Sequence, residues 1–283
     1  MGRIAYVNGR FVPHGDAMVH IEDRGYQFAD GVYEVYAVRG GRLLDEEGHF
    51  ARLERSLGEL SMACDLSRKS LQLISRELLR RNRVIDGVLY LQITRGVAPR
   101  DHAFPVGVRC SIIMTAKAYD YAKAEERARA GVAVRTFPDL RWARRDIKSV
   151  SLLPNVLAKQ AARMAGAYEA WLVDEDGFIT EGASSNAWIV DDRGVLVTRS
   201  LGPSILTGTI RQMLKQIALE HQIRIEERPF SIAEAKAARE AFMTAASAFV
   251  TPVVRVDQTV IGDGRPGQLS LKLRAAYLSK ALT

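Results

Sequence analysis

Two hairpin patterns near the N-terminus, and the helical periodicity that follows the second, constrain the fold of this chain most. Their turns are the dipeptides Asn8-Gly9 and Gly40-Gly41, which favour tight hairpins because their residues tolerate positive φ. The strand-like residues on either side are 4–7, 10–12, 33–38 and 42–44. Residues 50–60 then carry apolar side chains at steps of three and four, which predicts an amphipathic helix. Hairpins that alternate with helices indicate an α+β layer rather than a doubly wound sheet.

Similar patterns predict the remaining elements. Helices are expected at 67–82, 154–165, 209–221 and 269–282, with a short one possible within 124–130. Strands are expected at 88–94, 111–115, 132–136, 169–173, 187–190 and 195–198, and as a strand–turn–strand segment over 241–256. The composition shifts to Ala, Lys, Glu and Arg between 118 and 130. We therefore expect an N-terminal domain over 1–118, a linker at 119–123 and a C-terminal domain over 124–283.

Composition and charge indicate a globular protein that binds neither nucleic acid nor membrane. Hydrophobic residues make up 47% of the 283 residues and charged residues 26%. The net charge of +7 comes mostly from scattered residues, and the densest basic run, 76–83, lies on a helical pattern. Neither a secretory signal nor an apolar run near the roughly 18 residues of a membrane span is visible. Cys64 and Cys110 lack metal-ligand spacing, so we expect reduced thiols, no metal site and a cytoplasmic location.

Two short segments carry the chemistry. Residues 144–149 read RRDIKS, and residues 180–186 read TEGASSN. Lys148 can form a Schiff base with an aldehyde if desolvation or cationic neighbours, such as the arginines before it, keep its amine partly unprotonated. Glu181 can hold a pyridine nitrogen protonated and so strengthen the electron sink of a pyridoxal cofactor. Either segment alone would be read as a surface lysine or a turn, whereas the pair indicates a pyridoxal phosphate enzyme.

The lysine segment continues as SVSLLPNVLAKQ over residues 149–160. With TEGASSN, it resembles the D-amino-acid transaminase family, in which branched-chain transaminases and aminodeoxychorismate lyase share one fold. The resemblance extends from residues 6–9 to 252–253. It implies pyridoxal phosphate fold type IV, an α+β fold with a smaller N-terminal α/β domain, which would carry the substrate-carboxylate residues, and a larger cofactor-binding C-terminal domain of mixed α/β structure. It also implies pyridoxal 5'-phosphate as cofactor, Lys148 as the catalytic lysine and Glu181 at the pyridine nitrogen; Lys159 is the alternative lysine.

The resemblance assigns the cofactor's phosphate to three places. Residues 206–211 read LTGTIR, a glycine before a helix start, where backbone N–H groups bind phosphate well. By resemblance these are the amides of Thr209 and Ile210, although many relatives have an aliphatic residue first and a threonine second. Arg52, in HFARL, matches the family's phosphate arginine. The third place falls on TAASA, where alanines stand at the expected positions and Ser247 is the candidate.

Substrate choice depends on how the carboxylate of the amino acid is bound. The resemblance implies that D-amino-acid enzymes use a tyrosine of one subunit together with an arginine and a histidine, two positions apart, from its neighbour. The matching residues are Tyr33, Arg100 and His102, and their surroundings RGYQFADG (24–31) and TRGVAPRDHAFP (94–105) match as well. A guanidinium can bind a carboxylate through two N–H bonds, to which a phenol and an imidazole add others. A homodimer with shared active sites is therefore implied.

The expected function is a ping-pong transaminase that moves the amino group of a D-amino acid such as D-alanine to a 2-oxo acid such as 2-oxoglutarate. Three alternatives share the fold: a branched-chain L-amino-acid transaminase, an (R)-selective amine transaminase and aminodeoxychorismate lyase. Arg100 and His102 favour the D-amino-acid enzyme over the first and the third. Two alternatives of other classes are a non-catalytic protein that binds pyridoxal phosphate and a basic nucleic-acid-binding protein.

Overall fold

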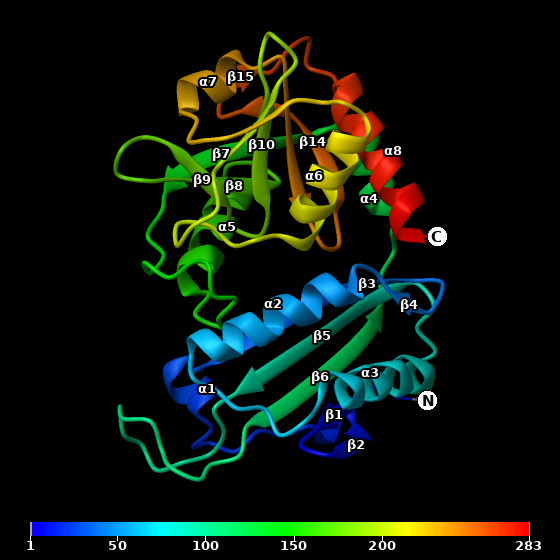
Figure 1. Ribbon diagram of the computed structural model, residues 1–283, viewed down its shortest axis with the longest axis vertical. Coiled ribbons are helices and arrows are strands. Elements are labelled where there is room, and N and C mark those ends of the chain that lie inside the picture. The colour runs from blue at the N-terminus through cyan, green and yellow to red at the C-terminus, as the bar shows by residue number, and fades with distance from the viewer. Residues whose placement is uncertain (1, 283) are drawn as a thin grey trace. The chain divides into compact units, whose positions relative to one another are not determined.

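The computed structural model describes residues 2–282 and divides into two compact units (Figure 1). The first unit runs to Tyr121 and also takes in residues 147–151, and the second holds residues 122–146 and 152 onward. The segment 147–151 therefore belongs to the first unit, although the sequence places it inside the C-terminal domain. The linker at 119–123 and the roles given to the two domains stay predictions.

The first unit is built on one antiparallel sheet. Its strands are β1 (Ile4–Val7), β2 (Arg10–Pro13), β3 (Gly31–Arg39), β4 (Arg42–Leu43), β5 (Gly87–Thr94) and β6 (Ser111–Ala118). Their order is β2-β1-β6-β5-β3-β4, and every neighbouring pair is antiparallel. Asn8 and Gly9 have φ of 46° and 92°, and Gly40 and Gly41 have φ of 57° and 75°. Both predicted hairpin turns are therefore confirmed.

Helices of the first unit pack on this sheet. They are α1 (Arg24–Phe28), α2 (Glu46–Glu59) and α3 (Arg68–Asn82), with a 3-10 turn, η1 (His14–Asp16). Helix α2 packs on β3, and α3 packs on β1 and β6. Phe50 and Leu53 of α2 and Leu78 of α3 are almost fully buried in the core. At about 1.5–3 kcal/mol for each large apolar side chain, this burial fixes both helices to the sheet.

The second unit is built on a larger sheet of mixed direction. Its strands are β7 (Val132–Pro138), β8 (Glu169–Val173), β9 (Ile179–Gly182), β10 (Asn186–Val190), β11 (Leu196–Thr198), β12 (Ile225–Glu227), β13 (Glu240–Ala245), β14 (Phe249–Val256) and β15 (Thr259–Val260). The order is β12-β11-β10-β13-β14-β7-β8-β9, with β15 paired to β14. The pairs β11/β12, β14/β7 and β7/β8 are parallel, and the others are antiparallel.

The helices of the second unit are α4 (Ala122–Ala130), α5 (Leu153–Met164), α6 (Thr209–Glu220), α7 (Ile232–Ala237) and α8 (Gln268–Leu282). Helix α5 packs on β7 and β8, and α6 and α8 lie side by side (Figure 1). Within residues 2–282, no helix is long and apolar enough to cross a membrane. The same residues contain no group of His, Cys, Asp and Glu side chains that could hold a metal ion.

Candidate active site

Lys148 is fixed through the backbone around it. Residues 147–151 pair with the start of β3 in the first unit. The N–H of Tyr33 donates to the carbonyl oxygen of Lys148 at 3.0 Å, and the N–H of Val150 donates to that of Gly31 at 3.0 Å. These bonds fix the backbone of Lys148 as pairing with a neighbouring strand would, although Lys148 belongs to none of the named strands.

The side chain of Lys148 lies against an aromatic ring. Its Nζ is 4.1 Å from the centroid of the Tyr33 ring, which stacks on Tyr90 at 5.7 Å. The N–H of Lys148 also donates to Ser56 Oγ at 3.3 Å, and Ile147 is buried in the core. The structure thus brings two of the predicted residues, Lys148 and Tyr33, together. A tyrosine face attracts a cation, so this contact orients the Lys148 side chain.

Arg52 lies in a buried ion cluster. Its Nε and Nη2 donate to the two carboxylate oxygens of Glu34 at 2.8 and 2.7 Å, and Glu34 is fully buried. His49 Nδ1 lies 2.6 Å from Glu34 Oε2. Burial would raise the pKa of Glu34, but Arg52 and His49 outweigh it and hold that pKa at about 2. Burial lowers the pKa of His49 more than Glu34 raises it. Sequence reasoning missed Glu34 and His49.

Arg100 and His102 lie on an exposed loop of the first unit. The Arg100 guanidinium carbon is 4.8 Å from the centroid of the Phe28 ring, and the His102 ring centroid is 5.4 Å from it. Both side chains are exposed. Among the described residues of one chain, no hydrogen bond or ring contact joins either of them to Tyr33. The structure therefore brings Arg100 and His102 to one ring but not to the predicted tyrosine.

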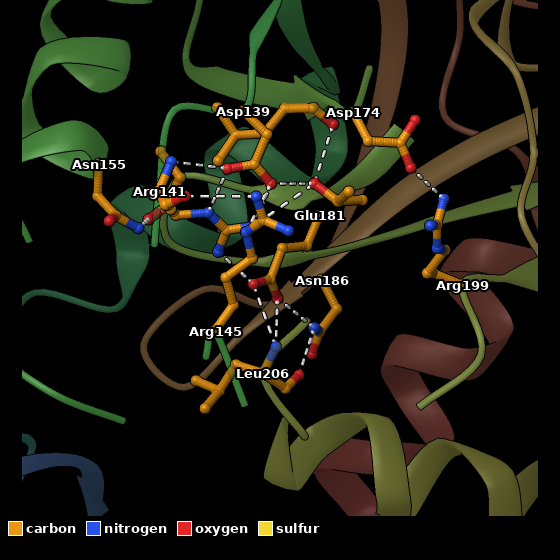
Figure 2. Close-up of polar contacts among 12 residues, drawn as sticks. Asp139, Arg141, Arg145, Asn155, Asp174, Glu181, Asn186, Arg199 and Leu206 are labelled. Atoms are coloured by element: carbon orange, nitrogen blue, oxygen red, sulfur yellow. Dashed lines mark hydrogen bonds and ion pairs between the residues drawn. The ribbon is translucent and has the colours of Figure 1, made fainter. Parts of the chain in front are cut away.

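In the second unit, Glu181 is the centre of a buried polar cluster (Figure 2). Arg141 Nη1 donates to Glu181 Oε1, and Asn186 Nδ2 donates to Oε2 at 2.9 Å. The N–H of Leu206 donates to both carboxylate oxygens at 3.1 and 3.2 Å. Burial raises the pKa of Glu181 above its ordinary value, although Arg141 acts in the opposite direction. A raised pKa suits a carboxyl group that shares a proton with a ring nitrogen.

Arg141 is a second functional candidate that sequence reasoning missed. Besides Glu181, it binds Asp139 through Nε at 2.9 Å and through Nη2 at 2.7 Å. Thr180 donates its hydroxyl to Asp139 at 2.7 Å. Burial lowers the pKa of Arg141, but its two carboxylate partners outweigh this and raise that pKa. The Arg141–Glu181 pair joins residues 40 apart in the sequence, so no local pattern indicates it.

The start of α6 is shaped by one glycine. Gly208 is the N-cap of the helix and makes no side-chain capping hydrogen bond. A Cβ on Gly208 would lie 2.0 Å from Asn186 Oδ1, so any other residue there would displace the Asn186 amide. Asn186 Nδ2 also donates to the carbonyl oxygen of Leu206 at 2.9 Å. Asn186 therefore links Glu181 to the helix start that carries Thr209 and Ile210.

Ser247 lies in the turn between β13 and β14. The turn is closed by the Ala248 N–H, which donates to the carbonyl oxygen of Ala245 at 3.1 Å. Thr244, three residues before Ser247, is paired with Asn186 in the sheet register. Strand pairing thus places this turn at the end of the sheet to which Asn186 belongs. The side chain of Ser247 is half-buried.

The predicted residues fall into both units, and each unit contributes a distinct set. The first holds Lys148, Tyr33, Arg52, Arg100 and His102, and the second holds Glu181, Thr209, Ile210 and Ser247. This division follows the chemistry: the first set contains the lysine and the candidate carboxylate binders, whereas the second contains the candidate ring-nitrogen partner and most of the phosphate binders.

Comparisons with known proteins identify the family. The family Amino-transferase class IV matches residues 31–256. A D-alanine aminotransferase of Bacillus licheniformis is 39% identical over 98% of this chain and 96% of its own length. The branched-chain amino acid aminotransferase of Escherichia coli has the same fold, with a TM-score of 0.91 at 24% identity over 99% of this chain and 95% of that chain. A hypothetical aminotransferase from Mycobacterium tuberculosis, in its PLP-bound form, has a TM-score of 0.84 at 20% identity over 99% of both chains. The fold is the α+β fold type IV, and the chain belongs to the class IV aminotransferases.

Proposed function

We propose that this aminotransferase moves the amino group of a D-amino acid such as D-alanine to a 2-oxo acid such as 2-oxoglutarate by a ping-pong mechanism. Amino acids and oxo acids are the substrates of its family. The Bacillus licheniformis relative, a D-alanine aminotransferase, supports the D-amino-acid branch. The observation that carries the chemistry is the hydrogen-bonded path from Glu181 through Asn186 to the start of α6. Pyridoxal phosphate presents a pyridine nitrogen and a phosphate on one ring, and a link between a buried acid and a helix start supports a site for both groups.

The cofactor is pyridoxal 5'-phosphate, which, when bound, draws the electron pair left at the substrate Cα into its ring. The second unit fits this group in two respects. Glu181 is a buried carboxylate with a raised pKa, suited to the pyridine nitrogen. The N-cap of α6 is a glycine, which has no side chain of its own at the helix start, and the amides and positive dipole end of a helix suit an anion.

We assign the phosphate to the amides of Thr209 and Ile210, with Ser247 and Arg52 as further donors. Thr209 and Ile210 are the first two residues of α6. Two nitrogens of Arg52 bind Glu34. A guanidinium presents five N–H donors, so it can bind a carboxylate on one edge and a phosphate on another.

We assign the proton transfers to Lys148. Its Nζ would take the proton from the substrate Cα and deliver it to C4′ of the cofactor, first as general base and then as general acid. The backbone bonds to β3 and the contact with the Tyr33 ring hold this Nζ in place. Such fixed placement lowers the barrier, because the proton donor and acceptor need no further ordering.

Stereochemistry follows from the carboxylate binders. We propose that Tyr33 of one subunit and Arg100 and His102 of its neighbour bind the substrate carboxylate, which makes the enzyme a homodimer. Two observations support this arrangement: Arg100 and His102 are exposed, and no described contact joins them to Tyr33 within one chain. A substrate carboxylate bound by these three residues would turn the Cα–H of a D-amino acid towards Lys148.

We also propose a cytoplasmic location. Cys64 and Cys110 are both free in the structure. Free thiols persist in a reducing compartment, where disulfides are rare. Fractionation of cells that express the tagged protein would test the location directly: recovery with membranes or with secreted protein would contradict it.

Steady-state kinetics test the proposed function. Wild-type enzyme should form pyruvate from D-alanine and 2-oxoglutarate. The Lys148→Ala variant should lose this turnover, whereas Lys159→Ala, whose lysine pairs with Glu169 at 3.1 Å, should keep most of it. Turnover of L-leucine in place of D-alanine would support the branched-chain alternative. A Lys148→Ala variant with wild-type activity would refute the assignment of this lysine.

A further inference from the structure

We propose that Arg24 is a positioning residue for substrate binding: it holds the loop 97–104 in the conformation that presents Arg100 and His102. The inference rests on the proposed function, because it takes these two residues as carboxylate binders. It adds a residue that touches neither substrate nor cofactor and acts through the backbone of the loop.

Arg24 bonds directly to the loop. Its side chain is only 4% exposed. Nη1 donates to the carbonyl oxygen of Asp101 at 2.6 Å, and Nη2 lies 3.4 Å from that of His102. The first carbonyl belongs to the peptide that joins Asp101 to His102, and the second to the peptide that joins His102 to Ala103. One guanidinium therefore binds the backbone on either side of the His102 Cα, close in sequence to Arg100.

Asp30 fixes Arg24 in turn. Arg24 Nε donates to Asp30 Oδ2 at 2.8 Å, and Arg95 binds both carboxylate oxygens of Asp30 at 2.7 and 3.0 Å. Burial would raise the pKa of Asp30, but the two arginines outweigh it and hold that pKa below its ordinary value. Asp30 is therefore an anion at neutral pH and anchors the planar fork of Arg24 in one orientation.

The Phe28 ring links Arg24 to the two candidate binding side chains. The guanidinium carbons of Arg24 and Arg100 are each 4.8 Å from the centroid of the Phe28 ring. The His102 ring is 5.4 Å from the same ring. Two guanidinium groups near one ring repel each other, and the anionic Asp30 beside Arg24 offsets that repulsion. The exposed Arg100 is thus directed by packing as well as by its backbone.

Backbone hydrogen bonds fix the start of the loop. The N–H of Arg24 donates to the carbonyl oxygen of Gly96 at 2.9 Å, and Asp23 forms a β-bridge with Val97. Gly96 has a φ of 99°, and a Cβ there would lie 2.0 Å from the carbonyl oxygen of Arg109. Only glycine therefore fits at this position, where the start of the loop lies against the residues that follow it. Without the side chain of Arg24, the backbone at Asp101 and His102 would lose both of its hydrogen bonds to the guanidinium, and substrate binding would have to order it. That ordering would weaken binding.

The kinetic test compares Arg24→Met with Arg39→Met. Arg39 is a partly exposed arginine of β3 that pairs with Asp86 and is far from the loop in the sequence. In Arg24→Met we expect KM for D-alanine and for 2-oxoglutarate to rise about tenfold or more, which corresponds to the loss of one charge-assisted hydrogen bond, with kcat changed much less. Arg24→Lys keeps a cation that can pair with Asp30 but lacks the several N–H donors of a planar guanidinium. Its KM should therefore fall between those of Arg24→Met and the wild type. Arg39→Met should match the wild type.

Amide hydrogen exchange gives a readout that does not depend on catalysis. Arg24→Met should accelerate exchange within residues 97–104 and leave β5 protected, whereas Arg39→Met should not affect the loop. Unchanged KM values and unchanged exchange in both Arg24 variants would overturn the inference, as would a loss of kcat with KM unaltered. If wild-type enzyme failed to act on D-alanine while the loop still loosened in Arg24→Met, the proposed substrate would be wrong and only the structural part of the inference would stand.

Discussion

Replacing Glu34 by Gln should destabilise the first unit by about 3 kcal/mol at pH 7. Glu34 is fully buried and bonds to Arg52 and His49, and its pKa is held at about 2 against an ordinary value of 4.5. Each tenfold change in proton affinity corresponds to about 1.36 kcal/mol, so the charged form stabilises the fold by about 3 kcal/mol. A glutamine keeps the shape of the side chain but leaves the charge of Arg52 buried without its counter-ion.

The loss of stability caused by Glu34→Gln should become smaller as the pH falls. The pKa of Glu34 is lower in the folded state, so its contribution is complete above the ordinary pKa of 4.5 and is lost as the pH falls towards about 2. The difference in stability between wild type and Glu34→Gln should therefore be largest near neutral pH. By about pH 3 it should have shrunk by roughly 2 kcal/mol.

Amide exchange in β3 (Gly31–Arg39) is a suitable assay, because this strand belongs to the first unit. Tryptophan fluorescence serves as an internal reference for the second unit, which contains all three tryptophans of the chain. The matched control is Glu54→Gln on α2, whose exposed carboxylate pairs with Arg68 and should contribute less than about 1 kcal/mol. Equal exchange free energies in Glu34→Gln and Glu54→Gln would refute the reasoning.

Two further variants probe the second unit. Gly208→Ala should weaken the binding of pyridoxal phosphate, measured by titration of the cofactor-free protein, because the added Cβ would lie 2.0 Å from Asn186 Oδ1. Gly202→Ala, with nothing within 4 Å of its Cβ, is the control, and equal affinities in the two variants would contradict the account. Arg141→Met should lower the free energy of unfolding of the second unit by about 3–5 kcal/mol, because Glu181 would stay buried without its cation. Unfolding followed by tryptophan fluorescence measures this loss, and a wild-type transition would be the opposing result.

Long elements with a clear period could be predicted from the sequence. The expected helices at 67–82 and 209–221 are confirmed as α3 and α6, which lie within one residue of these bounds. Short elements were missed: α1 has five residues, and β9 and β12 have four and three. Such segments are too short to show a period, and tertiary pairing decides their conformation. Helix α7 did carry a local signal, since Ser231 and Glu234 form a capping box.

The candidate site divides in a similar way. Motifs with fixed spacing indicated Lys148 and Glu181, and their roles stay predictions. The contacts that hold such residues were not visible in the sequence, because Arg141 reaches Glu181 from another part of the chain and Glu34 reaches Arg52 from β3 to α2. Pairing of this kind arises only when the chain folds. The membership of residues 147–151 in the first unit has the same origin, since it depends on their bonds to β3.

The D-amino-acid assignment can be tested by the absorbance spectrum of the purified protein with pyridoxal phosphate, recorded before and after the addition of D-alanine and, in a separate sample, of L-leucine. We expect a near-visible band of lysine-bound cofactor that bleaches with D-alanine and persists with L-leucine. Bleaching by L-leucine alone would contradict the D-amino-acid assignment and the roles of Arg100 and His102. No band at all with added cofactor would contradict the role of Lys148 itself.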